Sequence, residues 1–420
     1  MVFSMHAFTL LFLVMLALSI GIQLWLTQRQ AVHVRTHRQQ VPQAFAQQIS
    51  LDAHQKAADY TLAKLSLGRY EGIYGLAILL LLTLGGGLQL LDNLWRGSGL
   101  TELWMGVGFI LSLLLLSSLL EMPFTLYRTF RLEHAFGFNR TTPALFMGDL
   151  LKQGLLLLLL GTPLVALVLW LMASSGSWWW LYVWLVWTSF TLLMLWAYPA
   201  FIAPLFNRFT PLEDDTLRQR IERLLERCGF ASQGIFVMDG SRRSAHGNAY
   251  FTGTGNNKRI VFFDTLLENL NADEIEAVLA HELGHFHHKH VRARLLQMVV
   301  MSFTGLALLG WLIQQPWFFT ALGMEQASTH AALVLFLLVM PVFTFFIQPL
   351  LAISMRKHEF EADAFAAQQA SAQDLINALV KLYRENASTL TPDPLYSSWH
   401  DSHPPAPVRI AHLKAKHTHV

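Results

Sequence analysis

The stretch "AHELGHFHHK" (residues 280–289) gathers four histidines in a chain that is otherwise rich in apolar residues. His281 and His285 are four residues apart, so on a helix they lie on one face. Two imidazoles on one face can bind a single zinc ion, and Glu282 supplies the base of an HExxH arrangement. The stretch predicts a metal-dependent hydrolytic site on a helix, to which the fold must bring a third ligand.

The helix that carries this motif is predicted to begin after Asn271, because Glu274, three residues on, completes a capping box. We expect the helix to run through the motif and onward into the hydrophobic stretch that follows. His287, His288 and His290 lie off the ligand face, which predicts solvated or interfacial side chains. The competing interpretation is a histidine-rich helix at a membrane interface that holds no metal.

The composition of the chain indicates a membrane protein. Of its 420 residues, 53% are hydrophobic and only 14% are charged, whereas soluble proteins carry about 25% charged residues. The net charge of +2 does not favour nucleic acid as a partner. A single cysteine, Cys228, excludes an internal disulfide and a thiolate metal cage.

Seven hydrophobic stretches are long enough to cross a bilayer, which takes roughly 20 apolar residues. They cover residues 7–26, 73–91, 101–120, 154–172, 177–197, 296–314 and 331–353. The first lacks preceding basic residues and a clear cleavage site, which predicts an uncleaved anchor. Three glycines at 85–87 lie in the second stretch and are expected to let neighbouring helices approach closely.

Basic residues are distributed unevenly among the connecting loops, and such loops stay in the cytoplasm. Six follow the first stretch: Arg29, Arg35, Arg38, Lys56, Lys64 and Arg69. The loops at 92–100, 173–176 and 315–330 together contain one, Arg96. This asymmetry predicts an outside N-terminus and a cytoplasmic C-terminus. The polar segments 198–295 and 354–420 would then both lie at the cytoplasmic face.

The polar segments are expected to form a small α+β domain. Residues 212–229 have the pattern of an amphipathic helix, with Leu217, Ile221, Leu224 and Leu225 on one side. Three short strands are predicted at 234–241, 248–255 and 257–264, the last two joined by a hairpin turn at 253–257. The fold class is therefore mainly α, with seven membrane helices and a zincin-like α+β metalloprotease domain that includes a small β-sheet.

The chain divides into four predicted regions. Residues 1–197 form a membrane region of five helices, and residues 198–295 hold the strands and the HExxH helix. Residues 296–353 form two more membrane helices, and residues 354–420 complete the catalytic domain with the third zinc ligand.

The third ligand is predicted in "RKHEFEADAFA" (356–366), where Glu359 and Asp363 share one face of a helix. Two histidines and a glutamate make a thermolysin-type ligand set. A metal-ligating histidine usually donates its other N–H to a carboxylate, a role that suits Asp363. His358 is a rival ligand, and Glu361 is expected to be a charged surface group.

"HELGH" followed by "EFEAD" resembles the type I CAAX prenyl proteases, which are integral-membrane zinc endopeptidases. The likeness extends along nearly the whole chain. It includes "LEHAFGFNRTT" (132–142), "YPAFIAPLFNRFTPLED" (198–214), "SRRSAHGNAYFTG" (241–253) and "SHPPAPVR" (402–409). On this resemblance one Zn²⁺ per chain would be held by His281, His285 and Glu359.

The resemblance also implies roles for residues that the bare sequence would leave as ordinary surface groups. Glu282 would be the general base, and His403 and Arg409 would stabilise the oxyanion that forms on the scissile carbonyl. Asn248, Ala249 and Tyr250 match a strand beside which a substrate peptide lies. An extended peptide can add to such a strand edge through backbone hydrogen bonds, although an ordinary hairpin strand would have the same sequence pattern.

The resemblance implies peptide or protein substrates with a C-terminal lipidated cysteine, reached at the membrane surface. A bacterial inner membrane is expected, where membrane-protein quality control would be the role, or the endoplasmic reticulum membrane in a eukaryote. Three other classes compete, of which a catalytically silent scaffold is opposed by the complete set of metal ligands and base. A site-2-type protease would place the motif in the bilayer centre, which its polar neighbours oppose. A zinc transporter or sensor would leave Glu282 without a purpose.

Overall fold

The computed structural model describes residues 6–252 and 258–417. Within these residues, seven helical stretches are long and apolar enough to cross a membrane. They are Ala7–His37, Leu51–Leu82, Glu102–Glu133, Pro143–Ser174, Gly176–Phe206, His290–Leu312 and Thr329–Gln369. The prediction of a mainly α, polytopic fold with about seven membrane helices and a small sheet is confirmed.

The membrane helices are built from fifteen elements, several of which join end to end. Helices α1 (Ala7–His37), α2 (Leu51–Leu82) and α12 (His290–Leu312) stand alone. The joined stretches comprise α4 (Glu102–Tyr127) with η2 (Arg128–Glu133), α5 (Pro143–Leu156) with η3 (Leu157–Gly161) and α6 (Thr162–Ser174), and α14 (Thr329–Thr344) with η7 (Phe345–Ile347) and α15 (Gln348–Gln369). The fifth stretch comprises η4 (Gly176–Trp178), α7 (Trp179–Ala197), η5 (Tyr198–Ile202) and α8 (Ala203–Phe206).

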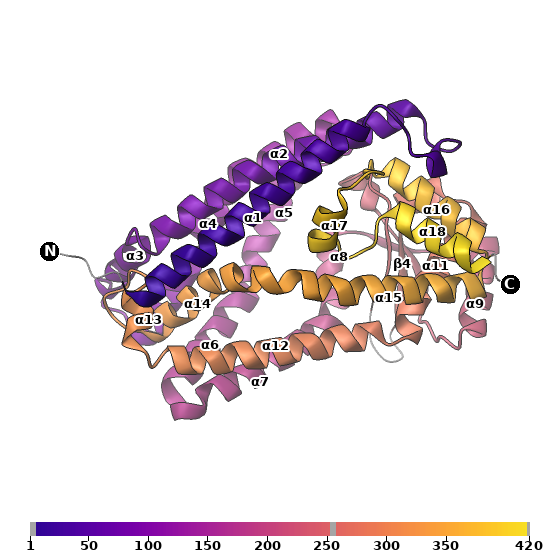
Figure 1. Cartoon of the computed structure of the whole chain (residues 1–420). Helices are drawn as coiled ribbons and strands as arrows, with labels where there is room; N and C mark the ends of the chain where they lie inside the picture. Colours follow the sequence, from indigo (N-terminus) through magenta and orange to yellow (C-terminus); the bar gives the residue numbers. More distant parts are fainter. Residues whose placement is uncertain (1–5, 253–257, 418–420) are drawn as a thin grey trace.

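The first two helices are much longer than the bilayer requires. Helix α1 has 31 residues and α2 has 32, so each is about 46–48 Å long, against a hydrocarbon core of about 30 Å. Their far ends run beside the polar part of the molecule, where α16, α17 and α18 lie (Figure 1). The short η1 (Gln43–Phe45) lies in the connection between them.

The second membrane helix does not lie where the sequence predicted it. Helix α2 ends at Leu82, and α3 (Gly87–Arg96) is a separate short helix. Gly86 has a φ of +76°, and a Cβ on Gly85 would lie 2.7 Å from the carbonyl oxygen of Leu81. The expectation that these glycines admit a neighbouring helix was wrong, because they make the turn between α2 and α3.

The sheet has four strands in the order β1-β2-β4-β3. These are β1 (Phe209–Pro211), β2 (Ile235–Met238), β4 (Arg259–Phe263) and β3 (Ala249–Thr252). Strands β2 and β4 are parallel, while β1 pairs antiparallel with β2 and β3 pairs antiparallel with β4. The three predicted strands are present. Strand β1 was not predicted, because three residues are too few to show an alternation of apolar and polar side chains. The predicted hairpin turn at 253–257 lies outside the described residues.

Helices surround this sheet and share one hydrophobic core with it. They are α9 (Asp215–Arg227), α10 (Asp264–Asn269), α11 (Ala272–His287), α16 (Ala372–Glu385) and α18 (Ala406–His417), with Phe365 and Ala366 of α15. The short helix α17 (Pro394–His400) precedes α18 and contributes no residue to this core. Leu217, Ile221, Leu224 and Leu225 of α9 are all buried, as the amphipathic pattern predicted. A second core lies among the membrane helices and includes Phe318 and Phe319 of α13 (Pro316–Thr320).

Helix α11 does not continue into the sixth membrane helix. Lys289 adopts a left-handed φ of 60°, and α12 starts afresh at His290. The expectation of one continuous helix was therefore wrong. The break matters because it changes the direction of the chain directly after the histidine motif.

Candidate metal centre and active site

Helix α11 carries the histidine pair and is fixed at its start by the predicted capping box. The amide of Glu274 donates to Asn271 Oδ1 at 2.9 Å, and the amide of Asn271 donates to Glu274 Oε2 at 2.9 Å. Lys381 of α16 adds an ion pair to the same carboxylate. The start of the helix is therefore held in place two to three turns before His281.

Close packing of α11 against α15 brings the third candidate ligand to the histidines. Gly284 lies between them on α11, and a Cβ there would lie 2.8 Å from Cα of Ala362. Only a glycine lets the two backbones approach this closely. Glu359 lies one turn before Ala362 on α15 and is 1% exposed.

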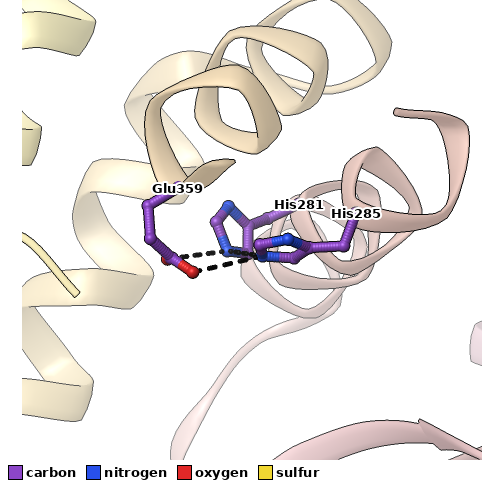
Figure 2. Close-up of side chains that lie close together, drawn as sticks. All are labelled: His281, His285 and Glu359. Carbon is purple, nitrogen blue, oxygen red and sulfur yellow. Dashed lines mark hydrogen bonds and ion pairs between the residues drawn. The ribbon is translucent and has the colours of Figure 1, made fainter. Parts of the chain in front are cut away.

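The three side chains point toward one another (Figure 2). Nε2 of His281 lies 3.5 Å from Oε2 of Glu359, and Nε2 of His285 lies 3.4 Å from Oε1. The two Nε2 atoms are 3.3 Å apart. The structure thus brings together the three residues that the sequence proposed as metal ligands.

These separations suit a tetrahedral zinc site. Ligands at about 2.0–2.1 Å from a zinc ion lie about 3.3–3.4 Å from one another along the edges of a tetrahedron. Oε2 of Glu359 is also buried without a hydrogen-bond donor among the described residues. A divalent cation between the three atoms would compensate that buried charge and leave a fourth position open.

Asp363 lies on the far side of the His281 ring. Nδ1 of His281 donates to Oδ1 of Asp363 at 2.9 Å, and Arg409 binds both carboxylate oxygens. Asp363 is fully buried. The sequence predicted this role for Asp363, as a carboxylate that fixes the ring of a metal-binding histidine.

The same contacts determine the protonation of His281 in the metal-free protein. Burial lowers the pKa of the imidazole, and the nearby Arg409 lowers it further. The hydrogen bond to Asp363 and the nearby carboxylate of Glu359 outweigh both and raise the pKa of His281 to about 9. At neutral pH a metal ion must therefore displace a proton from this ring.

His403 and Arg409 approach the centre from different sides. Nε2 of His403 lies 3.3 Å from Oε1 of Glu359, and its side chain is 60% exposed, so it lies at the open side. Arg409 is buried, and its Nη1 is 3.6 Å from Oε2 of Glu359. Since Asp363 binds two nitrogens of Arg409, the guanidinium lies on the Nδ1 side of His281.

Glu282 follows the first histidine on α11 and is half-buried. Among the described residues its carboxylate forms no hydrogen bond or ion pair with another side chain. A carboxylate without a protein partner is available to accept a proton from a water molecule, as a general base requires.

Asn248 directly precedes β3, and Ala249 and Tyr250 begin it; β3 is an edge strand. In the sheet order β1-β2-β4-β3, the edge of β3 opposite β4 has no strand partner in the described part of the chain. The strand is held against α11 by aromatic contacts, with the rings of Phe251 and Phe286 5.1 Å apart. An edge close to the histidine helix is thus open to pairing with an extended peptide.

Two residues that the sequence assigned to the surface lie next to the centre. His290 is 3% exposed, with Nδ1 3.0 Å from Nδ1 of His285 and Nε2 2.9 Å from Oε2 of Glu361. The prediction of a solvated His290 was wrong, whereas Glu361 is partly exposed, with 36% of its side chain accessible, and binds His290. Helical periodicity misplaced His290 because α11 ends at His287 and Lys289 turns the backbone, and that break had no signal in the sequence.

The other histidines lie outside the ligand cluster. His287 and His288 are exposed, as predicted. His358, the rival ligand, stacks on His290 with ring centroids 4.0 Å apart and is not one of the three residues around the candidate metal position.

Two protein-family models match the chain. Residues 30–208 match the CAAX prenyl protease N-terminal region of five membrane helices, and residues 211–417 match peptidase family M48. The human protein named CAAX prenyl protease 1 homolog is 32% identical over 93% of this chain and 92% of its own. The Arabidopsis thaliana protein of that name is 37% identical over 74% of this chain and 73% of its own. The chain belongs to the CAAX prenyl protease family of M48 peptidases.

A solved structure of the family shows the same fold. The crystal structure of Ste24p from S. mikatae is 30% identical, with a TM-score of 0.89, and the match covers 97% of this chain and 99% of that one. Membership of the CAAX prenyl protease family makes this chain a multi-pass membrane zinc metalloendopeptidase, as the sequence predicted. A zinc transporter or sensor is not favoured.

Proposed function

We propose that this metalloendopeptidase binds one Zn²⁺ through His281, His285 and Glu359 and cleaves peptides held at the surface of its own membrane. The observation that carries the proposal is the mutual spacing of 3.3–3.5 Å among the three ligand atoms. When bound, the zinc ion supplies Lewis acidity toward water and a carbonyl oxygen.

The protein's own side chains carry out the remaining chemistry. Glu282 takes a proton from the attacking water and passes it to the leaving amine. His403 lies at the open side of the centre and donates to the oxyanion as it forms. Asp363 and Arg409 hold the ring of His281, and Nη1 of Arg409 adds positive charge near the reacting carbonyl.

The edge strand β3 supports a particular way of holding the substrate. Asn248, Ala249 and Tyr250 pair with an extended peptide, whose backbone continues the sheet on the side away from β4. Recognition through backbone groups tolerates many side chains, so specificity must come from other surfaces.

A cavity of about 650 Å³ provides such a surface. It lies among residues of α1, α2 and the tail, and His403 is part of its wall. Lys64 and Arg69 contribute cationic groups and Tyr396 an aromatic ring. One end of the cavity therefore lies next to the candidate catalytic centre, while α1 and α2 connect it to the membrane.

We assign the centre to the cytoplasmic face, in keeping with the basic loops. C-terminal processing of lipidated proteins is the first role proposed, since the relatives bear the name CAAX prenyl protease. Quality control of membrane proteins is the second. Because the membrane helices continue into the metal centre, both roles are favoured over the cleavage of soluble proteins.

The test is Glu282→Gln in the full chain, purified in detergent. The variant should keep one zinc ion per chain and lose about 10²–10⁴-fold in peptide cleavage, because only the base is removed. Glu268→Gln on α10 is the matched control, since Glu268 is exposed. A Glu282→Gln variant that cleaves at the normal rate would disprove the assignment of the base.

A further inference from the structure

A chain of hydrogen bonds leads away from the second histidine of the centre. Nδ1 of His285 lies 3.0 Å from Nδ1 of His290, and Nε2 of His290 lies 2.9 Å from Oε2 of Glu361. His290 is 3% exposed, whereas the Glu361 side chain is 36% exposed. This series of hydrogen bonds thus begins at a metal ligand, passes through a buried ring and ends at a carboxylate near solvent.

The break after α11 creates this arrangement. Lys289 in the left-handed conformation turns the backbone, and α12 begins with His290. On a continuous helix, His290 would be five residues beyond His285 and away from its ring. With the break, the two Nδ1 atoms face each other.

Metal binding determines where the protons lie. A neutral imidazole that binds zinc through Nε2 carries its proton on Nδ1. Nδ1–H of His285 therefore donates to Nδ1 of His290, which must be unprotonated. The proton of His290 is then on Nε2, from which it donates to Glu361. Each hydrogen bond in this series then joins one donor to one acceptor.

We propose that His290 and Glu361 are positioning residues that hold His285 in the tautomer and orientation needed to bind zinc. The inference rests on the proposed function, because it takes His285 Nε2 as a ligand. It gives His285 the kind of support that Asp363 gives His281. The two supports differ, since Asp363 is a buried anion in direct contact and Glu361 acts through a neutral ring.

A different interpretation makes His290, His358 and Glu361 a second metal site, since one donor atom from each lies within 4.8 Å of the others. Two observations oppose it. The rings of His290 and His358 stack at 4.0 Å with an interplanar angle of 15°, so their in-plane lone pairs do not converge. Nε2 of His290 also carries the proton whenever His285 binds zinc.

The experiment measures the zinc dissociation constant of the purified full chain by competition with a chelator. His290→Ala should weaken zinc binding about 10–100-fold. His290→Asn should restore most of the affinity, because its amide oxygen can accept the proton of His285 where Nδ1 did. The matched control is His288→Ala, an exposed neighbouring histidine that should bind zinc as the wild type does.

Glu361→Ala supplies a second measurement at the partly exposed end of the chain, where truncation leaves the core intact. It should weaken zinc binding less than His290→Ala does. Glu361→Gln should weaken it less than Glu361→Ala, because its amide oxygen still accepts a hydrogen bond. His281→Ala separates the two hypotheses. If it retains zinc at full occupancy, the proposed function fails; if it loses zinc while His290→Ala does not, only the positioning role fails.

Two results would overturn the inference. One is a dissociation constant for both His290→Ala and Glu361→Ala within twofold of wild type. The other is a wild-type protein that binds two zinc ions per chain and loses the second in His358→Ala, which would assign these residues to a metal site of their own.

Discussion

The carboxylate of Glu359 lies 3.4 Å from Nε2 of His285, although two membrane helices, α12 and α14, separate the two residues in the sequence. The metal centre therefore depends on how those helices pack as much as on the residues that touch the ion.

Removing the third ligand should remove the metal. Glu359→Ala is expected to reduce bound zinc from one per chain to well below one, since two imidazoles alone do not complete a site. Metal analysis after dialysis measures this. Glu268→Ala, at an exposed residue of α10, should retain its zinc under the same conditions, and full occupancy in Glu359→Ala would point to a different ligand.

Weakening the support of His281 should weaken zinc binding without removing a ligand. Asp363→Asn loses the charge that pairs with Arg409 and the imidazole, and we expect a 10–100-fold increase in the zinc dissociation constant. Chelator competition measures it. Asp215→Asn, at a side chain that is 70% exposed, is the control. Equal affinities in both variants would contradict the role of Asp363.

Zinc binding should release a proton at neutral pH. The pKa of His281 is raised to about 9 in the metal-free protein, so the ring is protonated at pH 7 and must become neutral to bind zinc. Zinc affinity should therefore rise with pH up to about 9 and fall as the pH drops. Calorimetry at pH 7 in two buffers of different ionisation enthalpy counts the protons. Identical heats in the two buffers would exclude this coupling.

The same shift has a consequence for the metal-free fold. A histidine whose pKa is higher in the folded state stabilises that state below its unfolded pKa of about 6.5. This stabilisation is lost as the pH rises toward 9. The sign is thus opposite to that for zinc affinity, and bound zinc should hide the effect.

The close approach of α11 and α15 should not tolerate a side chain on Gly284. Gly284→Ala places a Cβ 2.8 Å from Cα of Ala362 and is expected to destabilise the protein by about 1–3 kcal/mol. Thermal unfolding in detergent, with and without zinc, measures the change. Gly154→Ala is the control, because a Cβ there meets nothing within 4 Å. An unchanged midpoint for Gly284→Ala would show that the helices can separate freely.

The orientation in the membrane can be tested with single cysteines in a Cys228→Ser background. Ser174 at the end of α6 and Ser371 before α16 are both exposed. With an outside N-terminus, Ser174→Cys should react with an impermeant maleimide in intact cells, and Ser371→Cys only after permeabilisation. The reverse pattern would place the metal centre on the outer side.

The sequence predicted those parts of the structure that depend on short-range patterns. The capping box at Asn271, the amphipathic face of α9 and the shared face of His281 and His285 all depend on helical spacing. The role of Asp363 as the carboxylate that supports a metal-binding histidine followed from the chemistry of zinc ligands. Hydrophobic length gave the number of membrane helices.

Features that depend on backbone breaks or tertiary contacts could not be predicted in this way. The turn at Gly86 and the left-handed Lys289 each interrupt a pattern that continues in the sequence. The contact between Glu361 and His290 was not predicted, because the two residues lie on different helices. The burial of Arg409 behind His281 likewise depends on how α18 packs against α15.

The length of α1 and α2 limits how the protein can be truncated. Phe45 and Ile49, between those helices, belong to the same core as the sheet and α11. Arg29 binds Asp393 just before α17. A fragment beginning after the fifth membrane helix would expose that core and free the loop that carries His403. We therefore expect inhibitor screening and crystallisation to need the intact protein in lipid or detergent.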